Sequence, residues 1–137
     1  MKARAVIIHE LAHAHAALAA AVELGLPVEL WSAPGAAAYA GAGWFAAVMR
    51  AAANQAPPAA FIAVLDCDDR ADLVQAALRQ GLTQVCFRGS RATAARLADI
   101  ARHYGATLHR KMPHALDLLD ADDPLAACRA WFDAAGT

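Results

Sequence analysis

The sequence predicts a single α/β domain over residues 1–137, a three-layer αβα sandwich built on five parallel strands. Five short apolar runs alternate with longer alanine-rich stretches of helical character, and most of these runs end in polar or glycine residues. The length of 137 residues fits one domain with a continuous core. Chains with this alternation form a parallel sheet covered by helices, and ligands bind along one edge of that sheet.

The first half of the chain supplies two strand–helix pairs. The first strand contains three consecutive β-branched residues, Val6, Ile7 and Ile8. The helix after it ends at Gly25, and the next helix ends before Pro57, because glycine and proline are helix stop signals. Strands are predicted at residues 3–8, 28–31, 60–65, 84–87 and 106–109, and helices at residues 10–24, 44–54, 69–80, 91–104 and 123–136.

The second half of the chain repeats the pattern. The third apolar run is the most apolar of the five, and the helix after it has leucine and alanine at core-facing spacing before Gly81. The fourth helix stops at Gly105. A polar connection follows the fifth strand, and Asp123-Pro124 then starts a helix that ends at Gly136.

Strand polarity predicts the flavodoxin-like order 2-1-3-4-5, with strands numbered along the chain. The first, third and fourth runs are almost wholly apolar, as expected where both faces of a strand are covered. The second run carries Glu29 and the fifth carries Thr107 and His109, which favours edge positions. This order places the topological switch point between strands one and three. A Rossmann-like order, 3-2-1-4-5, is the alternative.

The charge balance argues against two classes of partner. The net charge is −1 and the sequence pI is about 6.6, so no positive field favours nucleic acid or an anionic membrane surface. The longest uncharged run, residues 30–49, contains a proline and three glycines in a weakly hydrophobic background, which argues against a membrane span.

Cysteine usage and the first residues predict a cytoplasmic protein. No signal-peptide pattern follows Lys2 and Arg4. Cys67, Cys86 and Cys128 are widely spaced and form no CxxC pair, so reduced thiols are expected. No cofactor and no metal site belong to the leading interpretation.

The predicted carboxyl ends of the strands gather polar and small residues on one edge of the sheet. With the switch point between strands one and three, His9 and Glu10 face Asp66 and Asp68 across a crevice. His9 or Asp66 is the candidate acid or base if the site is catalytic. The candidate ligand-binding residues are His9, Glu10, Ser32, Gly35, Asp66, Asp68, Arg88, Gly89, Ser90 and Lys111.

The turn after the fourth strand has the clearest mechanism for binding an anion. Gly89 lets the backbone approach a ligand closely, and Ser90 suits the N-cap of the next helix, whose first amides would point at an anion. Arg88 adds a two-point donor, and Arg110 and Lys111 add charge. The alternative is a capped helix start with solvated arginines.

Two short resemblances suggest other functions. The run His9-Glu10-Leu11-Ala12-His13 resembles the HExxH signature of zincin metallopeptidases. That resemblance implies a zinc hydrolase with His9 and His13 as ligands and Glu10 as general base.

The strand ends also resemble those of response-regulator receiver domains, through Asp66, Ser90 and Lys111 beside Met112-Pro113. That resemblance implies a phosphoacceptor at Asp66 and a signalling role without catalysis. The alternative for these aspartates is an N-cap with first-turn acids that complement the helix dipole.

The segment 32–45 combines small residues with Tyr39, Trp44 and Phe45. Its small residues favour close packing of a helix on the sheet or on a second subunit, with the two ring side chains at its end as anchors. We therefore expect a homo-oligomer, most simply a homodimer. The leading function is the binding of a small anionic ligand, bearing phosphate or carboxylate, at the carboxyl ends of the strands.

Overall fold

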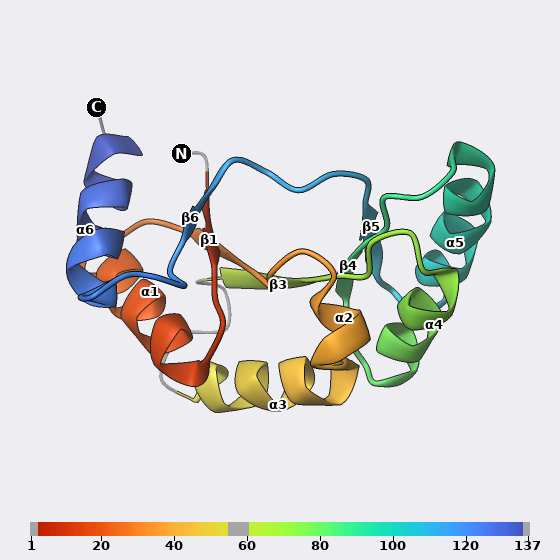
Figure 1. Ribbon diagram of the computed structural model, residues 1–137, viewed down its shortest axis with the longest axis horizontal. Coiled ribbons are helices and arrows are strands. Elements are labelled where there is room, and N and C mark those ends of the chain that lie inside the picture. Colours follow the sequence, from red (N-terminus) through yellow and green to blue (C-terminus); the bar gives the residue numbers. More distant parts are fainter. Residues whose placement is uncertain (1–2, 55–60, 136–137) are drawn as a thin grey trace. The chain divides into compact units, whose positions relative to one another are not determined.

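The computed structural model describes residues 3–54 and 61–135, in which strands and helices alternate except for one pair of consecutive helices and one pair of consecutive strands (Figure 1). The strands are β1 (Arg4–Ile7), β2 (Val28–Trp31), β3 (Phe61–Asp66), β4 (Gln84–Cys86), β5 (Thr107–His109) and β6 (Ala115–Asp117). The helices are α1 (Leu11–Leu24), α2 (Ala36–Tyr39), α3 (Ala42–Ala53), α4 (Ala71–Arg79), α5 (Arg91–His103) and α6 (Pro124–Ala135). The α/β class with a parallel sheet is confirmed, and the three-layer arrangement stays a prediction.

The strand number and the strand order differ from the prediction. Within the described ranges the sheet has six strands in the order β5-β4-β3-β2-β1-β6, not five in the order 2-1-3-4-5 or 3-2-1-4-5. Residues 115–117 of the expected polar connection form β6, which pairs with β1. A three-residue strand that contains Asp117 has too short an apolar run to be recognised in the sequence.

The prediction that the strand carrying Glu29 lies at an edge is also wrong, because β2 is an inner strand. The indole N–H of Trp31 donates to Oε1 of Glu29 at 2.9 Å, so the carboxylate has a partner within its own strand. A polar residue whose hydrogen bond is satisfied is tolerated away from the edge. The prediction that β5 lies at an edge is confirmed.

The chain divides into two compact units. Unit 1 comprises residues 1–31, 48–63 and 113–137, and unit 2 comprises residues 32–47 and 64–112. Both α3 and β3 therefore begin in one unit and end in the other. In the described ranges, no helix has the length and apolar character needed to cross a membrane.

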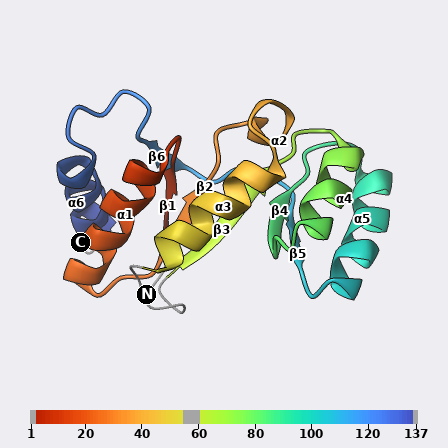
Figure 2. The ribbon, with the colours of Figure 1, turned by 90° about the horizontal axis from the view of Figure 1, so that it is seen from below.

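In unit 1, β1 pairs in parallel with β2 and β6, and α1 lies beside α6 (Figures 1 and 2). The buried face of α1 is mostly alanine, which lets neighbouring elements approach closely. An ion pair of 2.7 Å joins Glu23 to Arg129 across the two helices. The indole of Trp131 donates to the carbonyl of Ala5 at 3.0 Å, which ties α6 to β1.

In unit 2, β4 pairs in parallel with β3 and β5, and α4 lies beside α5 (Figure 2). The register places Asp66 opposite Cys86, and Cys86 opposite His109. The last residues of these three strands therefore lie side by side at the carboxyl edge of the sheet. The hydrophobic core beneath this edge includes Val64, Leu65, Val74, Leu78, Val85, Phe87 and Leu97.

Candidate functional site

A buried carboxylate lies at the centre of the carboxyl edge of unit 2. Asp66 is the last residue of β3, and its side chain is fully buried. Arg88 meets it with two hydrogen bonds, from Nε to Oδ1 at 3.0 Å and from Nη2 to Oδ2 at 2.8 Å. A third of the Arg88 side chain remains exposed. The predicted donor is therefore already paired with an acid of the same chain, which leaves its remaining N–H groups for other partners.

The same aspartate organises the segment that follows β2. The backbone N–H of Gly35 donates to Oδ2 of Asp66 at 2.7 Å, and the N–H of Asp66 donates to Oγ of Ser32 at 2.8 Å. Gly35 has a φ of 70°, a conformation that residues with a Cβ adopt with difficulty. A glycine is thus required where this backbone turns toward the carboxylate.

The ionisation of Asp66 follows from these contacts. Burial alone raises the pKa of a carboxyl group, but here the hydrogen bonds from Arg88 and Gly35, together with the Arg88 charge, lower the pKa of Asp66 below its ordinary value. Asp66 is consequently an anion that is neutralised within the protein. A fully buried, paired carboxylate does not match the accessible phosphoacceptor that the receiver resemblance implies.

The loop after β4 is held from two sides. The N–H of Arg88 donates to the carbonyl of Asp68 at 2.6 Å, and Arg110 donates to the carbonyls of Phe87 at 2.5 Å and Gly89 at 2.9 Å. A Cβ on Gly89 would overlap Cζ of Phe87, whose ring is buried. Gly89 is therefore needed because the backbone crosses the face of a packed ring.

The N-terminus of α5 opens directly after this loop. Ser90 is its N-cap, and Oγ of Ser90 accepts from the N–H of Thr93 at 3.2 Å. The predicted cap is confirmed. The N–H groups at the start of a helix carry partial positive charge. The exposed Arg91 is the first residue of α5, and the exposed Arg110 and Lys111 follow β5.

The thiols of Cys67 and Cys86, near the carboxyl edge of unit 2, have low nucleophilic reactivity. Burial, and then the charge of Asp66, raises the pKa of Cys67 to about 12, and burial is also the main reason that the pKa of Cys86 rises to about 12. At neutral pH both remain thiols, so neither is an activated nucleophile.

Two predicted residues belong to unit 1. The order of the strands places β2 between β1 and β3, so the switch point expected between β1 and β3 does not exist. His9 and Glu10 follow β1 in unit 1, whereas Asp66 and Asp68 belong to unit 2. The facing of these two pairs across one crevice stays a prediction.

The HExxH run does not form one turn of helix. Since α1 begins at Leu11, His9 precedes the helix, and its backbone N–H donates to Nδ1 of His13 at 3.0 Å. The helical placement that the zincin resemblance implies is therefore wrong. Among residues 3–54 and 61–135, no three or more His, Cys, Asp or Glu side chains are grouped so that they could hold a metal ion.

Sequence reasoning missed Asp117 as a partner of His9. Nε2 of His9 lies 2.6 Å from Oδ1 of Asp117, the last residue of β6. The sequence signal for this partner is Asp117 directly after Ala115 and Leu116. Such a short apolar stretch before one acidic residue cannot be distinguished from a polar loop.

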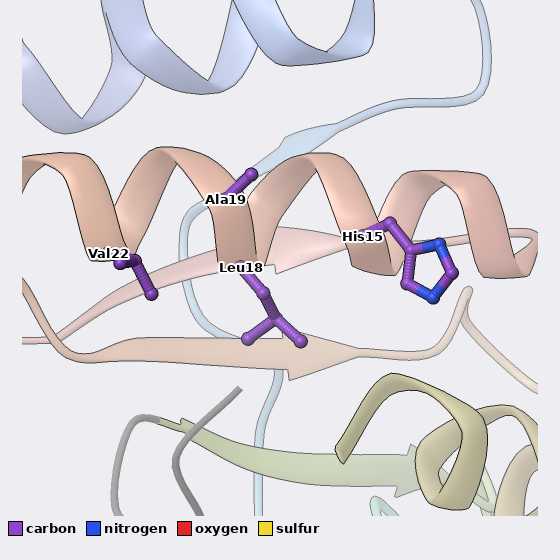
Figure 3. Close-up of a pocket in the computed structure, with 4 residues that line it drawn as sticks. All are labelled: His15, Leu18, Ala19 and Val22. Atoms are coloured by element: carbon purple, nitrogen blue, oxygen red, sulfur yellow. The ribbon is translucent and has the colours of Figure 1, made fainter. Parts of the chain in front are cut away.

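A shallow hollow of about 270 Å³ lies along α1 and is lined by His15, Leu18, Ala19 and Val22 (Figure 3). Nε2 of His15 is buried and has no hydrogen-bond partner in the described part of the chain. This hollow contains none of the predicted ligand-binding residues, because those follow the strands.

Of the predicted residues, unit 2 brings Ser32, Gly35, Asp68 and Arg88 together around Asp66, whereas Gly89 and Ser90 follow Arg88 in the loop before α5 and Lys111 follows β5. Residues 2–112 match the family model described as fructose-bisphosphate aldolase class-II, which covers well over half of the chain. No protein with a curated description matches the sequence.

Proposed function

The chain belongs to the class-II fructose-bisphosphate aldolase family, and from this premise we propose that it binds a small phosphate-bearing metabolite, such as a phosphorylated sugar. The proposed site is the carboxyl edge of unit 2, where the loop after β4 opens into α5. The family name supports the phosphate, since fructose bisphosphate carries two of them. The geometry of the loop after β4 supports the position of the site at the start of α5.

The observation that carries the proposal is the position of Arg110 beside the start of α5. Its guanidinium donates to the carbonyl of Gly89, two residues before the first residue of the helix. An anion that accepts hydrogen bonds from the amides of Arg91 and Ala92 would thus meet a fixed cation next to them. Arg91 and Lys111 add exposed positive charge.

The Asp66–Arg88 pair has a supporting role in this proposal. It neutralises its own charges and fixes both the segment at Gly35 and the loop at Gly89. A preorganised loop loses less conformational freedom when it binds a ligand. For this reason Arg88 is a poor residue for testing ligand binding, because its removal leaves a buried carboxylate unpaired.

A thermal-shift comparison tests the proposal. The probes are fructose 1,6-bisphosphate, inorganic phosphate, citrate and uncharged fructose. We expect fructose 1,6-bisphosphate to raise the unfolding temperature of the wild type and fructose to leave it unchanged. The rise should disappear in Arg110→Gln and shrink in Arg91→Ala.

The matched control is Arg96→Ala, which removes an exposed arginine from the same helix at a greater distance from its N-terminus. This variant should respond as the wild type does. A rise that survives Arg110→Gln and Arg91→Ala, or a rise of equal size with fructose, contradicts the proposed site.

A further inference from the structure

A histidine and an aspartate meet where β1 pairs with β6 in unit 1. His9 comes two residues after β1, and Asp117 ends β6, with Ile7 opposite Asp117 in the parallel register. The observed order also makes this pair of strands the switch point, because the chain runs outward from β1 to β5 and returns to the other side of β1 with β6. Parallel sheets bind ligands outside the carboxyl ends of strands at such a point.

The contacts of Asp117 fix which nitrogen of His9 is available. Oδ1 of Asp117 lies 2.6 Å from Nε2 of His9 and also accepts the backbone N–H of Leu119 at 3.0 Å. A carboxylate held in this way accepts the Nε2–H of a neutral imidazole. The lone pair of His9 then lies on Nδ1, which has no hydrogen-bond partner in the described ranges.

His13 holds the backbone beneath this ring. Nδ1 of His13 accepts the N–H of His9 at 3.0 Å, and the two rings meet edge to face with centroids 5.8 Å apart. Burial, more than the nearby charges, lowers the pKa of His13, which keeps its Nδ1 free to accept. The position of His9 is therefore set at both its backbone and its ring.

We propose that His9 is a proton-transfer residue, positioned by Asp117, that acts on an uncharged carbonyl or ester group of a ligand. The charge of the ligand follows from the surroundings: Asp117 contacts the His9 ring, and the largely exposed Glu10 lies 3.8 Å from Nε2 of the neighbouring His13 ring. An anionic group would be repelled there, so this site takes a different chemical class from the phosphate corner of unit 2. All its residues lie in unit 1, and the proposal does not depend on the proposed function.

The chemistry can be written for a neutral ester. Nδ1 of His9 takes a proton from water as the water oxygen bonds to the ester carbonyl carbon. The tetrahedral intermediate then expels the alkoxide or phenolate, and the imidazolium returns its proton to solvent. The Asp117 carboxylate stabilises the positive charge that His9 carries between these events.

The activity test uses 4-nitrophenyl acetate, and the readout is release of nitrophenolate. We expect the wild type to exceed His9→Gln by about 10-fold or more, and Asp117→Asn to fall toward the His9→Gln rate. The matched control is His103→Gln, which removes an exposed histidine of α5 and should leave the rate unchanged. Equal rates for the wild type and His9→Gln overturn the proposal.

Two further measurements test the proposal even if a variant folds poorly. A nitrophenyl ester with a carboxylate on its acyl chain should react more slowly than the acetate ester, and Glu10→Gln should narrow that gap. In the wild type, ¹⁵N spectra of labelled histidine should show the proton of neutral His9 on Nε2. A proton on Nδ1, or equal rates for the two esters, contradicts the proposal.

Discussion

Arg88 and Asp66 form a two-point ion pair in which the carboxylate is fully buried and the guanidinium is one-third exposed. A second arginine–aspartate pair of unit 2, Arg70 with Asp72, has nearly the same hydrogen-bond geometry, with distances of 2.9 and 2.8 Å, but lies in solvent. The two pairs therefore separate the effect of burial from the effect of geometry.

Breaking the buried pair should destabilise the fold far more than breaking the exposed one. Arg88→Gln leaves a buried carboxylate without its cation, and we expect the free energy of unfolding to fall by about 3 kcal/mol. Arg70→Gln should leave it essentially unchanged. Urea denaturation of both variants measures the difference, and equal losses would show that Asp66 is not buried in solution.

The lowered pKa of Asp66 predicts a loss of stability in acid. A carboxylate whose pKa is depressed in the folded state stabilises the fold above its unfolded pKa, about 3.9, and this stability disappears as the pH falls through the folded pKa. The gap in free energy of unfolding between the wild type and Asp66→Asn should therefore be widest above about pH 5 and narrow below pH 4. Denaturation curves from pH 7 to pH 2 test this, and a gap that stays constant contradicts it.

Replacing glycine by alanine should change the free energy of unfolding in opposite directions at two positions of unit 2. Gly89→Ala places a methyl group against the buried ring of Phe87, and we expect a destabilisation of about 1–3 kcal/mol. Gly43→Ala lies in α3 with no atom within 4 Å of the added Cβ, so the better helix propensity should stabilise by up to about 1 kcal/mol. Thermal unfolding of the two variants measures both signs, and a neutral Gly89→Ala shows that the ring of Phe87 moves aside.

The three thiols should react slowly in the folded protein. Burial raises the pKa of Cys67 and Cys86 to about 12 and that of Cys128 to about 11, so the thiolate fraction at pH 8 is very small. We expect iodoacetamide to label native protein at least ~100-fold more slowly than protein in urea. Peptide mass spectrometry identifies the labelled residue, and rapid native labelling of Cys67 contradicts its burial.

The fold class could be predicted because local signals agree along most of the chain. The strand at residues 28–31 was predicted with its observed bounds, and the helix starts at Arg91 and Pro124 match their capping residues. The strand order could not be predicted in this way. It was inferred from the polarity of Glu29, whose hydrogen bond to Trp31 is a side-chain contact that periodicity does not encode.

The candidate site was predicted only in part for a similar reason. The rule that ligand residues follow parallel strands selects Ser32, Gly35, Asp66 and Arg88, which contact one another in unit 2, and their role in ligand binding stays a prediction. It gave no sign that Arg88 pairs with Asp66 instead of facing solvent. Asp117 was missed because β6 is only three residues long.

An NMR titration tests the proposed phosphate site most directly. Fructose 1,6-bisphosphate added to ¹⁵N-labelled wild-type protein should shift the amide signals of residues 89–92 in a saturable way, and Arg110→Gln should weaken the apparent affinity at least ~10-fold. Amide signals that stay unchanged at residues 89–92, or saturable shifts confined to other parts of the chain, contradict a phosphate site at the start of α5.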